Sequence, residues 1–399
     1  MPSGADGGAP ESPPAGVGVR WRRGALDWRP WLATAAVTLS SVAAGVLALC
    51  VSTWIVHQPF DAVANRFDTT WYWKIALSGY PHRVARSPID YSGLRGAFFP
   101  GLPGVERVVH DVLGGPAPLI TILVGTIGLV AAGLALRALV RLETGDDGAS
   151  SAVVALLAFF PGAYVFVMGY SEALAIPLAI LCLYFLHRRQ FVAAGVAAGL
   201  AGTMRLSASV LVLVCAVAAA QALFEPGARR QVRALVAPLV CPVLAASGLV
   251  AWLVVLKVRT GNALAFDVAE RLGWQDRFTL LTPFHDLRAF AAHPFHVPAD
   301  TMNALGVVLV VVACAALVAG WATARLAPVD AVYGLGILAL WLFTTNAGAF
   351  PRYLEMAFPV LVLAARGLPA RALVATTGAL GAVLAVLVLL FATSNPFFP

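Results

Sequence analysis

The feature that most constrains this chain is a series of long apolar runs separated by short basic clusters. Of its 399 residues, 60% are hydrophobic and only 12% are charged, whereas soluble domains are about 45–50% apolar and about 25% charged. Only a bilayer tolerates so little charge, because a chain in lipid must satisfy its backbone polar groups internally. The sequence therefore predicts an all-α polytopic membrane protein.

The basic clusters predict the topology. The segment "VRWRRGALDWR" precedes an apolar run over about residues 31–56, so we expect the N-terminus in the cytoplasm. Segment 191–224 is interpreted as two short spans with Arg205 at the outer turn, because basic clusters at both of its ends require an even number of crossings. Continuing the alternation gives about eleven transmembrane helices and an external C-terminus.

This topology divides the chain into three parts. Residues 1–30 are rich in Gly, Pro and Ala and are expected to be disordered and cytoplasmic. Residues 31–392 form the transmembrane domain, and residues 393–399 form an extracytoplasmic tail. No signal-cleavage pattern follows the N-terminal segment, so the first apolar run is expected to be retained as a span.

Nearly every unusual polar residue lies in a segment that this topology places outside the membrane. Two of these segments are long, 57–116 and 257–300, and two are short turns near 169–172 and 347–353. The expected site therefore lies on the extracytoplasmic face of the cell membrane. The net charge of +7 reflects arginines between the apolar runs, where the positive-inside rule places them, so we expect no nucleic-acid partner.

Neither the cysteines nor the histidines predict a metal site. The cysteines lie in or beside apolar runs and are expected to be small core residues: Cys50, Cys182, Cys215, Cys241 and Cys314. His285, His293 and His296 suggest a cluster, but their spacing, with a proline between the last two, does not place them on one helical face. We expect no metal and no cofactor.

Asp68 is the first candidate for chemistry. It lies in "NRFDTTWYWKIALSGY", just after the first apolar run. One interpretation is a loop acid that pairs with Arg66 or Lys74. The other is a carboxylate fixed at the start of a helix whose aromatic side chains lie at the lipid headgroups, where backbone N–H groups stabilise it. Such a carboxylate suits general-base catalysis on a hydroxyl.

Arg205 and Arg352 are the candidate anion ligands. Charged groups at membrane depth are costly unless paired, and a guanidinium matches a phosphate with two parallel hydrogen bonds. The alternative is that both arginines anchor helix ends. Glu172, in "MGYSEALAIP", also lies at an outer turn and could hold one of them. Nucleotide-binding and zinc-protease motifs are absent from the sequence.

The order of these segments resembles the PIG-V-like mannosyltransferases, the family of GPI mannosyltransferase 2 and its bacterial relatives. The resemblance rests on "FDTTWYWKIALSGY", "AFFPGLPGVERVV", "FFPGAYVFVMGYSEAL", "AAGVAAGLAGTMRLSA", "TGNALAFDVAERLGW" and "PRYLEMAFPVLVLAAR", and it covers about residues 50 to 366. Phe67 and Leu206 depart from it, where the family usually has Trp and Pro.

The resemblance implies a GT-C-type glycosyltransferase fold with amphipathic helices in the first outer loop. It also implies transfer of mannose from a polyprenyl-phosphate donor to a lipid-linked or cell-envelope acceptor, with Asp68 as the general base. We expect Arg205, Arg352 and Lys74 to bind the donor phosphate. The residues expected to line the substrate cavity are Trp71, Tyr72, Tyr170, Glu172, Trp274 and Tyr353.

Two other classes of function stay open at this point. A lipid transporter or flippase would have an internal repeat and polar groups at mid-membrane in both halves, and we find no convincing repeat. A non-enzymatic scaffold of the cell envelope would tolerate the loss of Asp68.

Overall fold

The computed structural model describes residues 27–225, 232–345 and 350–393. Most of the expected disordered N-terminus, most of the C-terminal tail and part of the turn at 347–353 lie outside these ranges. The first helix, α1 (Arg29–Val56), begins two residues inside the segment expected to be disordered, because Pro30 suits the first turn of a helix.

Helices make up the fold of the described residues, together with one isolated β-bridge between Phe278 and Thr344. Six helical segments there are long and apolar enough to cross a membrane: α1, α6 (Ala117–Thr144), η3 with α10 (Leu206–Ser209 and Val210–Phe224), α11 (Val232–Thr260), α14 (Pro298–Ala322) and α18 (Ala370–Ala392). Four apolar helices are shorter: α7 (Asp147–Phe159), α8 (Glu172–His187), α9 (Phe191–Gly202) and α15 (Pro328–Leu342). The prediction of a polytopic all-α membrane protein is confirmed.

Proline explains where predicted spans are interrupted. The span expected at 353–365 is two helices, α16 (Phe350–Met356) and α17 (Pro359–Gly367). Pro359 has no backbone N–H to continue the first helix, so it begins the second. Likewise, α7 ends at Phe159, and the 3₁₀-helix η2 (Pro161–Phe166) continues the chain.

Segment 191–224 is broken where expected, with Arg205 between α9 and η3.

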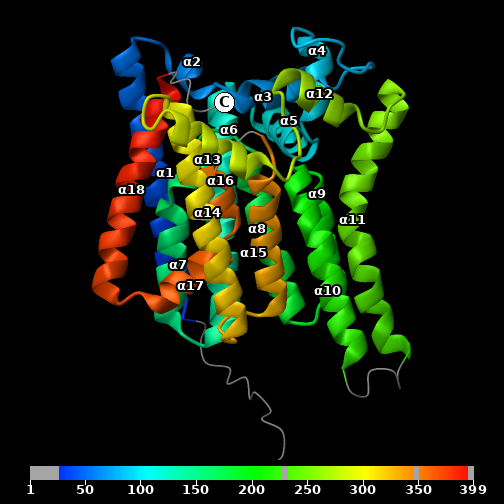
Figure 1. The fold of residues 1–399 in the computed structure, drawn as a ribbon, viewed down its shortest axis with the longest axis vertical. Helices are drawn as coiled ribbons and strands as arrows, with labels where there is room; N and C mark the ends of the chain where they lie inside the picture. Colours follow the sequence, from blue (N-terminus) through cyan, green and yellow to red (C-terminus); the bar gives the residue numbers. More distant parts are fainter. Residues whose placement is uncertain (1–26, 226–231, 346–349, 394–399) are drawn as a thin grey trace, which may run out of the picture.

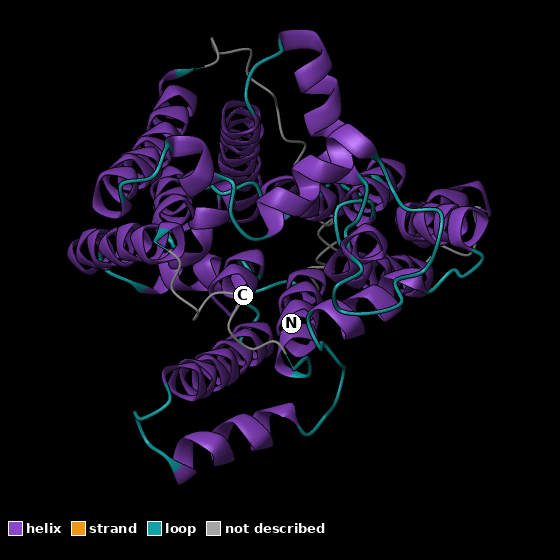
Figure 2. Ribbon diagram, turned by 90° about the horizontal axis from the view of Figure 1, so that it is seen from above, coloured by secondary structure: helices purple, strands orange, loops and turns teal. Residues whose placement is uncertain are grey.

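The long helices run side by side, and shorter helices gather at one end of the bundle (Figure 1). These are α2 (Phe60–Ala64), α3 (Asp68–Ser78), α4 (Tyr91–Leu94), α5 (Gly101–Leu113), α12 (Ala265–Gly273) and α13 (Thr282–Ala292). Figure 2 looks along the bundle, so that several long helices are seen end-on. Both long segments expected outside the membrane therefore lie at the same end.

Small residues allow the helices to pack closely. A Cβ atom at Gly199 on α9 would lie 2.5 Å from the carbonyl oxygen of Leu244 on α11. Contacts of this kind between helix backbones are typical of membrane bundles, where lipid provides no hydrophobic driving force between helices. Of the five cysteines, Cys182, Cys215 and Cys241 are buried as expected, whereas Cys50 is exposed on the outside of α1.

A second, smaller apolar cluster holds the short helices together. Its buried members include Tyr72 and Ile75 of α3, Leu94 of α4 and Leu102 of α5. Trp71 packs against this cluster, with its ring stacked on Phe98 at 5.7 Å between centroids. The aromatic stretch after Asp68 thus fixes α3 against its neighbours and does not simply face the lipid headgroups.

Candidate active site

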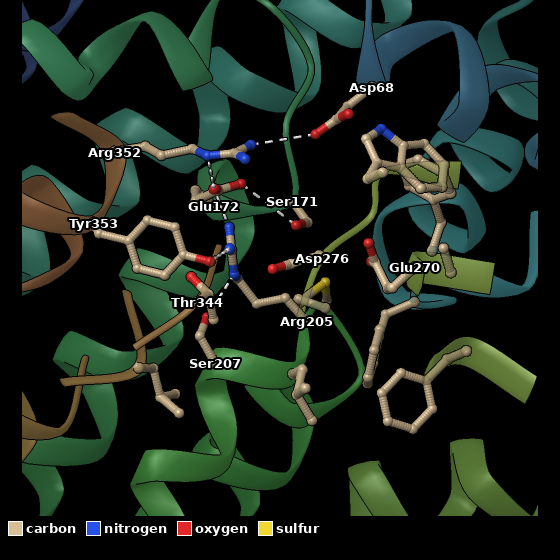
Figure 3. Close-up of a pocket in the computed structure, with 18 of the residues that line it drawn as sticks. Asp68, Ser171, Glu172, Arg205, Ser207, Glu270, Asp276, Thr344, Arg352 and Tyr353 are labelled. Carbon is tan, nitrogen blue, oxygen red and sulfur yellow. Dashed lines mark hydrogen bonds and ion pairs between the residues drawn. The ribbon is translucent and has the colours of Figure 1, made fainter. Parts of the chain in front are cut away.

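A cavity of about 200 Å³ opens at the end of the bundle where the short helices gather (Figure 3). Its walls come from α3, from the start of α8, from the turn between α9 and η3, from α12 and from α16. Segments far apart in the sequence therefore meet in one place. Among the residues expected at the site, those that line the cavity are Asp68, Tyr72, Glu172, Arg205, Trp274, Arg352 and Tyr353.

Asp68 is the first residue of α3, and a tertiary contact fixes the start of that helix. Phe67 precedes it with a positive φ of 54°, and its ring packs against Phe391 of α18 at 4.4 Å between centroids. The Thr69 hydroxyl donates to the carbonyl oxygen of Met168, which joins α3 to the segment before α8. The helix start is thereby anchored to the bundle.

The partner of Asp68 differs from each sequence expectation. Arg352 Nη1 donates to Asp68 Oδ2 at 3.2 Å. Arg66 instead donates to the Gln58 side chain, and the Lys74 ammonium lies over the Trp71 ring. No backbone N–H is recorded as donating to the Asp68 carboxylate within the described residues. Asp68 thus lies in the first turn of a helix as expected, and it also forms an ion pair with a distant arginine.

Glu172 holds both expected arginines. It is the first residue of α8, its side chain is 1% exposed, and its Oε1 forms an ion pair with Arg205 Nη1. Arg352 Nε lies 3.5 Å from the same oxygen. Two guanidinium groups thus share one buried carboxylate, while Arg352 also reaches Asp68. The four side chains carry two positive and two negative formal charges.

Neighbouring groups orient both guanidiniums. Arg205 Nε donates to Ser207 Oγ at 2.6 Å, and Arg205 Nη2 donates to the Tyr353 hydroxyl at 3.1 Å. The Arg352 guanidinium lies 5.1 Å from the centre of the Tyr170 ring, a distance typical of cation–π contact. Tyr170 is buried behind the cavity wall and does not line it.

Three of the residues expected at the site do not line the cavity: Lys74, Trp71 and Tyr170. Lys74 is exposed and does not reach the cavity, so it cannot complete the pair of arginines there. Trp71 packs against Phe98, and Tyr170 packs against the Arg352 guanidinium; Phe98 and Arg352 both line the cavity. Lys74 and Trp71 lie on the same helix as Asp68 and Tyr72 but point to other sides of it, which sequence spacing alone does not resolve.

Two acids that were not predicted also line the cavity, Glu270 of α12 and Asp276 after it. Glu270 lies on the opposite side of the view from Arg352 and Tyr353 (Figure 3). Burial, strengthened by the nearby Asp276 carboxylate, raises the pKa of Glu270 to about 8. Burial also raises the pKa of Asp68, and the Arg352 charge opposes that rise. Glu270 lies within "TGNALAFDVAERLGW", where it is one of two acids on a short helix and nothing local distinguishes the one that enters the cavity.

A third unpredicted acid lies beneath the site. Glu355, on α16 with Arg352, is fully buried, and neither of its carboxyl oxygens has a hydrogen-bond partner among the described residues. Burial of an unpaired carboxylate is costly, so this group favours its neutral form.

Known proteins match this chain in structure but not in sequence. No protein-family description matches the sequence, and no curated protein matches it. Among solved structures, ArnT from Cupriavidus metallidurans, bound to undecaprenyl phosphate, superposes with a TM-score of 0.51 at 15% identity, over 85% of this chain and 61% of ArnT. The fold is of the GT-C type.

Two further solved structures match with lower TM-scores. The apo state of the same ArnT gives a TM-score of 0.47 at 16% identity over 84% of this chain and 60% of ArnT. The apo oligosaccharyltransferase of Archaeoglobus fulgidus gives 0.42 at 13% identity over 89% of this chain and 56% of that protein. This chain thus spans about three fifths of the length of the ArnT structures. At these identities the comparison establishes the GT-C fold alone.

Proposed function

We propose that this chain is a membrane glycosyltransferase that moves a sugar from a polyprenyl-phosphate donor to an acceptor hydroxyl on the extracytoplasmic face of the cell membrane. One observation carries the proposal: Asp68, Arg205 and Arg352 meet in one cavity at the end of a membrane bundle. This arrangement offers a base and two anion ligands where a lipid-linked substrate can enter. ArnT, which shares the fold, has been solved with undecaprenyl phosphate bound.

The two arginines are suited to a lipid phosphate. A guanidinium donates two parallel hydrogen bonds to phosphate oxygens and keeps its charge at all physiological pH values. Glu172 orients both groups from the buried side, which leaves their remaining N–H donors for a ligand. Arg205 and Arg352 would bind the donor phosphate and stabilise the negative charge that it gains as the sugar leaves.

The reaction is a single displacement. The acceptor oxygen attacks the anomeric carbon of the sugar, and the bond from that carbon to the phosphate oxygen breaks. The electron pair of the broken bond stays on the polyprenyl phosphate, and Asp68 takes the acceptor proton. A phosphate whose charge is neutralised is already a good leaving group, so the reaction needs one base and no paired general acid.

The Arg352–Asp68 ion pair couples donor binding to base strength. While Arg352 lies 3.2 Å from the Asp68 carboxylate, its charge lowers the basicity of that group. A phosphate in the cavity competes for the same guanidinium and draws it away from Asp68. The carboxylate then becomes a stronger base only when the donor is present.

Mannose is the sugar that we propose, on the basis of the PIG-V-like motifs. Glu270 and Asp276 also line the cavity and offer carboxyl groups to sugar or acceptor hydroxyls. With a pKa of about 8, Glu270 is largely protonated at neutral pH and can donate a hydrogen bond as well as accept one. No metal or other cofactor is required by this mechanism.

The proposal is tested with the purified full chain in liposomes. The donor is polyprenyl-phosphate-[¹⁴C]mannose, the acceptor is a total lipid extract, and transferred label is followed over time. We expect time-dependent transfer from the mannosyl donor and at least tenfold slower transfer from the glucosyl equivalent. Equal rates would refute the choice of mannose, and donor binding without transfer from either donor would refute the transferase proposal.

The proposed orientation has its own test. Single cysteines at His82 and His293, both exposed, lie in the two long segments at the cavity end. In a cysteine-free background an impermeant thiol reagent should label both from outside intact cells, and Asp146→Cys at the other end should be protected. Protection of the first two would reverse the topology.

A further inference from the structure

A second polar cluster lies at the end of the bundle away from the cavity. Glu143 is the penultimate residue of α6, His187 is the last residue of α8, and Asp330 is the third residue of α15. The helix α8 begins at Glu172 in the cavity wall, and its 16 residues span about 24 Å. The two sites are therefore separate, although one helix contributes to both.

Three of the contacts in this cluster end on a single atom, and the Glu143 and Asp330 carboxyl groups are also hydrogen-bonded to each other. His187 Nε2 lies 3.0 Å from Asp330 Oδ2, 3.2 Å from Asp330 Oδ1 and 3.3 Å from Glu143 Oε1. An imidazole nitrogen carries either one hydrogen or one lone pair. It can therefore satisfy one of these oxygens at a time, whereas a single cation could be bound by the imidazole and both carboxyl groups at once.

The charged groups around the cluster are also relevant to cation binding. Two carboxylates face one imidazole, and the Asp330 side chain is only 3% exposed. Arg366 acts on Glu143 electrostatically, but its Nη1 donates to the carbonyl oxygen of Arg325, and no ion pair joins Arg366 to Glu143 within the described residues. Arg137 and Arg141 pair with Asp147. The hydrogen bond between the Glu143 and Asp330 carboxyl groups requires a proton, and a metal cation could take the place of that proton between the two groups.

We propose that Glu143, His187 and Asp330 form a binding site for a divalent transition-metal ion. One ligand atom from each residue lies within 4.8 Å of the others. Around one ion with bonds of about 2.0–2.2 Å, neighbouring ligand atoms lie about 3.0–3.5 Å apart, which matches the 3.0–3.3 Å contacts at His187. One imidazole nitrogen with carboxylate oxygens favours zinc over calcium or magnesium, which prefer oxygen ligands alone.

A cavity of about 160 Å³ adjoins the cluster at His187. Arg189 and Glu225 also line it, and Glu143 and Asp330 do not. Three helices that are distant in sequence would then be joined through one ion. Because only the folded bundle brings the three ligands together, ion binding should stabilise the protein against thermal unfolding.

The test uses the full chain in detergent after treatment with EDTA, titrated calorimetrically with ZnCl₂. We expect saturable binding of one Zn²⁺ per chain and a higher melting temperature with zinc. Both His187→Ala and Glu143→Gln should weaken binding at least tenfold, so the result does not depend on the folding of one variant. MgCl₂ should bind at least tenfold more weakly than ZnCl₂.

The outer histidines supply the matched control. His285, His293 and His296 are exposed, and a triple His→Ala variant removes every ligand that they could offer to added zinc. We expect this variant to bind zinc as the wild type does. The proposal is overturned if the wild type binds no zinc saturably, if His187→Ala binds it equally well, or if the triple variant loses binding.

Discussion

Arg352 and Asp68 are 284 positions apart in the chain, yet Arg352 Nη1 lies 3.2 Å from Asp68 Oδ2. The contact joins α16, in the C-terminal part of the chain, to α3, which lies shortly after the first membrane helix. It places the candidate base against one of the two candidate phosphate ligands. Several consequences of this arrangement can be measured.

Replacement of Asp68 by Asn should abolish most of the transfer without loss of donor binding. Asn keeps the shape but cannot take the acceptor proton, so turnover should fall by about 10²–10⁴-fold, or roughly 3–5 kcal/mol of barrier. Because Arg352 also loses its competing carboxylate, donor affinity should stay equal or increase. Initial rates at saturating donor and equilibrium binding of the donor give the two values.

Asp61 provides the control for that experiment. It lies in α2, is exposed, and does not line the cavity. Asp61→Asn should retain most of the activity. If Asp68→Asn transferred sugar within about threefold of the wild type, a deficit below ~1 kcal/mol, then Asp68 would not be the base.

Replacement of Glu172 by Gln should destabilise the whole protein. It removes the buried charge that holds Arg205 and Arg352, so both guanidiniums lose an ion pair while Arg352 keeps its contact with Asp68. Breaking a buried ion pair from one side costs about 3–5 kcal/mol. Unfolding by denaturant in detergent measures the loss. Asp111→Asn, which breaks an exposed pair with Arg107, should leave stability nearly unchanged.

Glu270 should set an alkaline limit on donor binding. Its pKa of about 8 means that it is largely neutral below pH 8 and becomes negative above it. The negative form repels the donor phosphate, so the KM for donor should rise above about pH 8, by at most about tenfold per pH unit. Glu270→Gln imitates the neutral form and should remove this rise.

Asp267 lies on the same helix as Glu270 but does not line the cavity, and it pairs with Arg271. Asp267→Asn should keep the wild-type pH profile. An alkaline rise in KM that persisted in Glu270→Gln would assign the limit to another group.

Replacement of Gly128 by Ala should lower both stability and activity, because it displaces the backbone next to Glu172. A Cβ atom at Gly128 on α6 would overlap the carbonyl oxygen of Ala173, the residue after Glu172. Such overpacking typically costs about 1–3 kcal/mol, and here it would also displace the start of α8. Both the melting temperature and the transfer rate should fall. Gly104→Ala on α5, where a Cβ meets nothing within 4 Å, should not lower either value.

The sequence by itself determined the class of protein and the end of the bundle that carries the site. Apolar runs and arginine clusters are local signals, so they predict membrane helices and outer segments without knowledge of helix packing. The same signals single out Asp68, Arg205 and Arg352, because charged residues beside membrane spans are costly without a partner.

Only the tertiary structure decided which groups are partners. The two nearest cations in sequence, Arg66 and Lys74, do not pair with Asp68, whereas Arg352 does. Glu172 holds two arginines at once, and Glu270 enters the cavity from a segment that the sequence marked only as a motif. The physical reason is that ion pairs depend on distance in space. In a helical bundle that distance is set by how the helices pack, which no stretch of sequence around Asp68 contains.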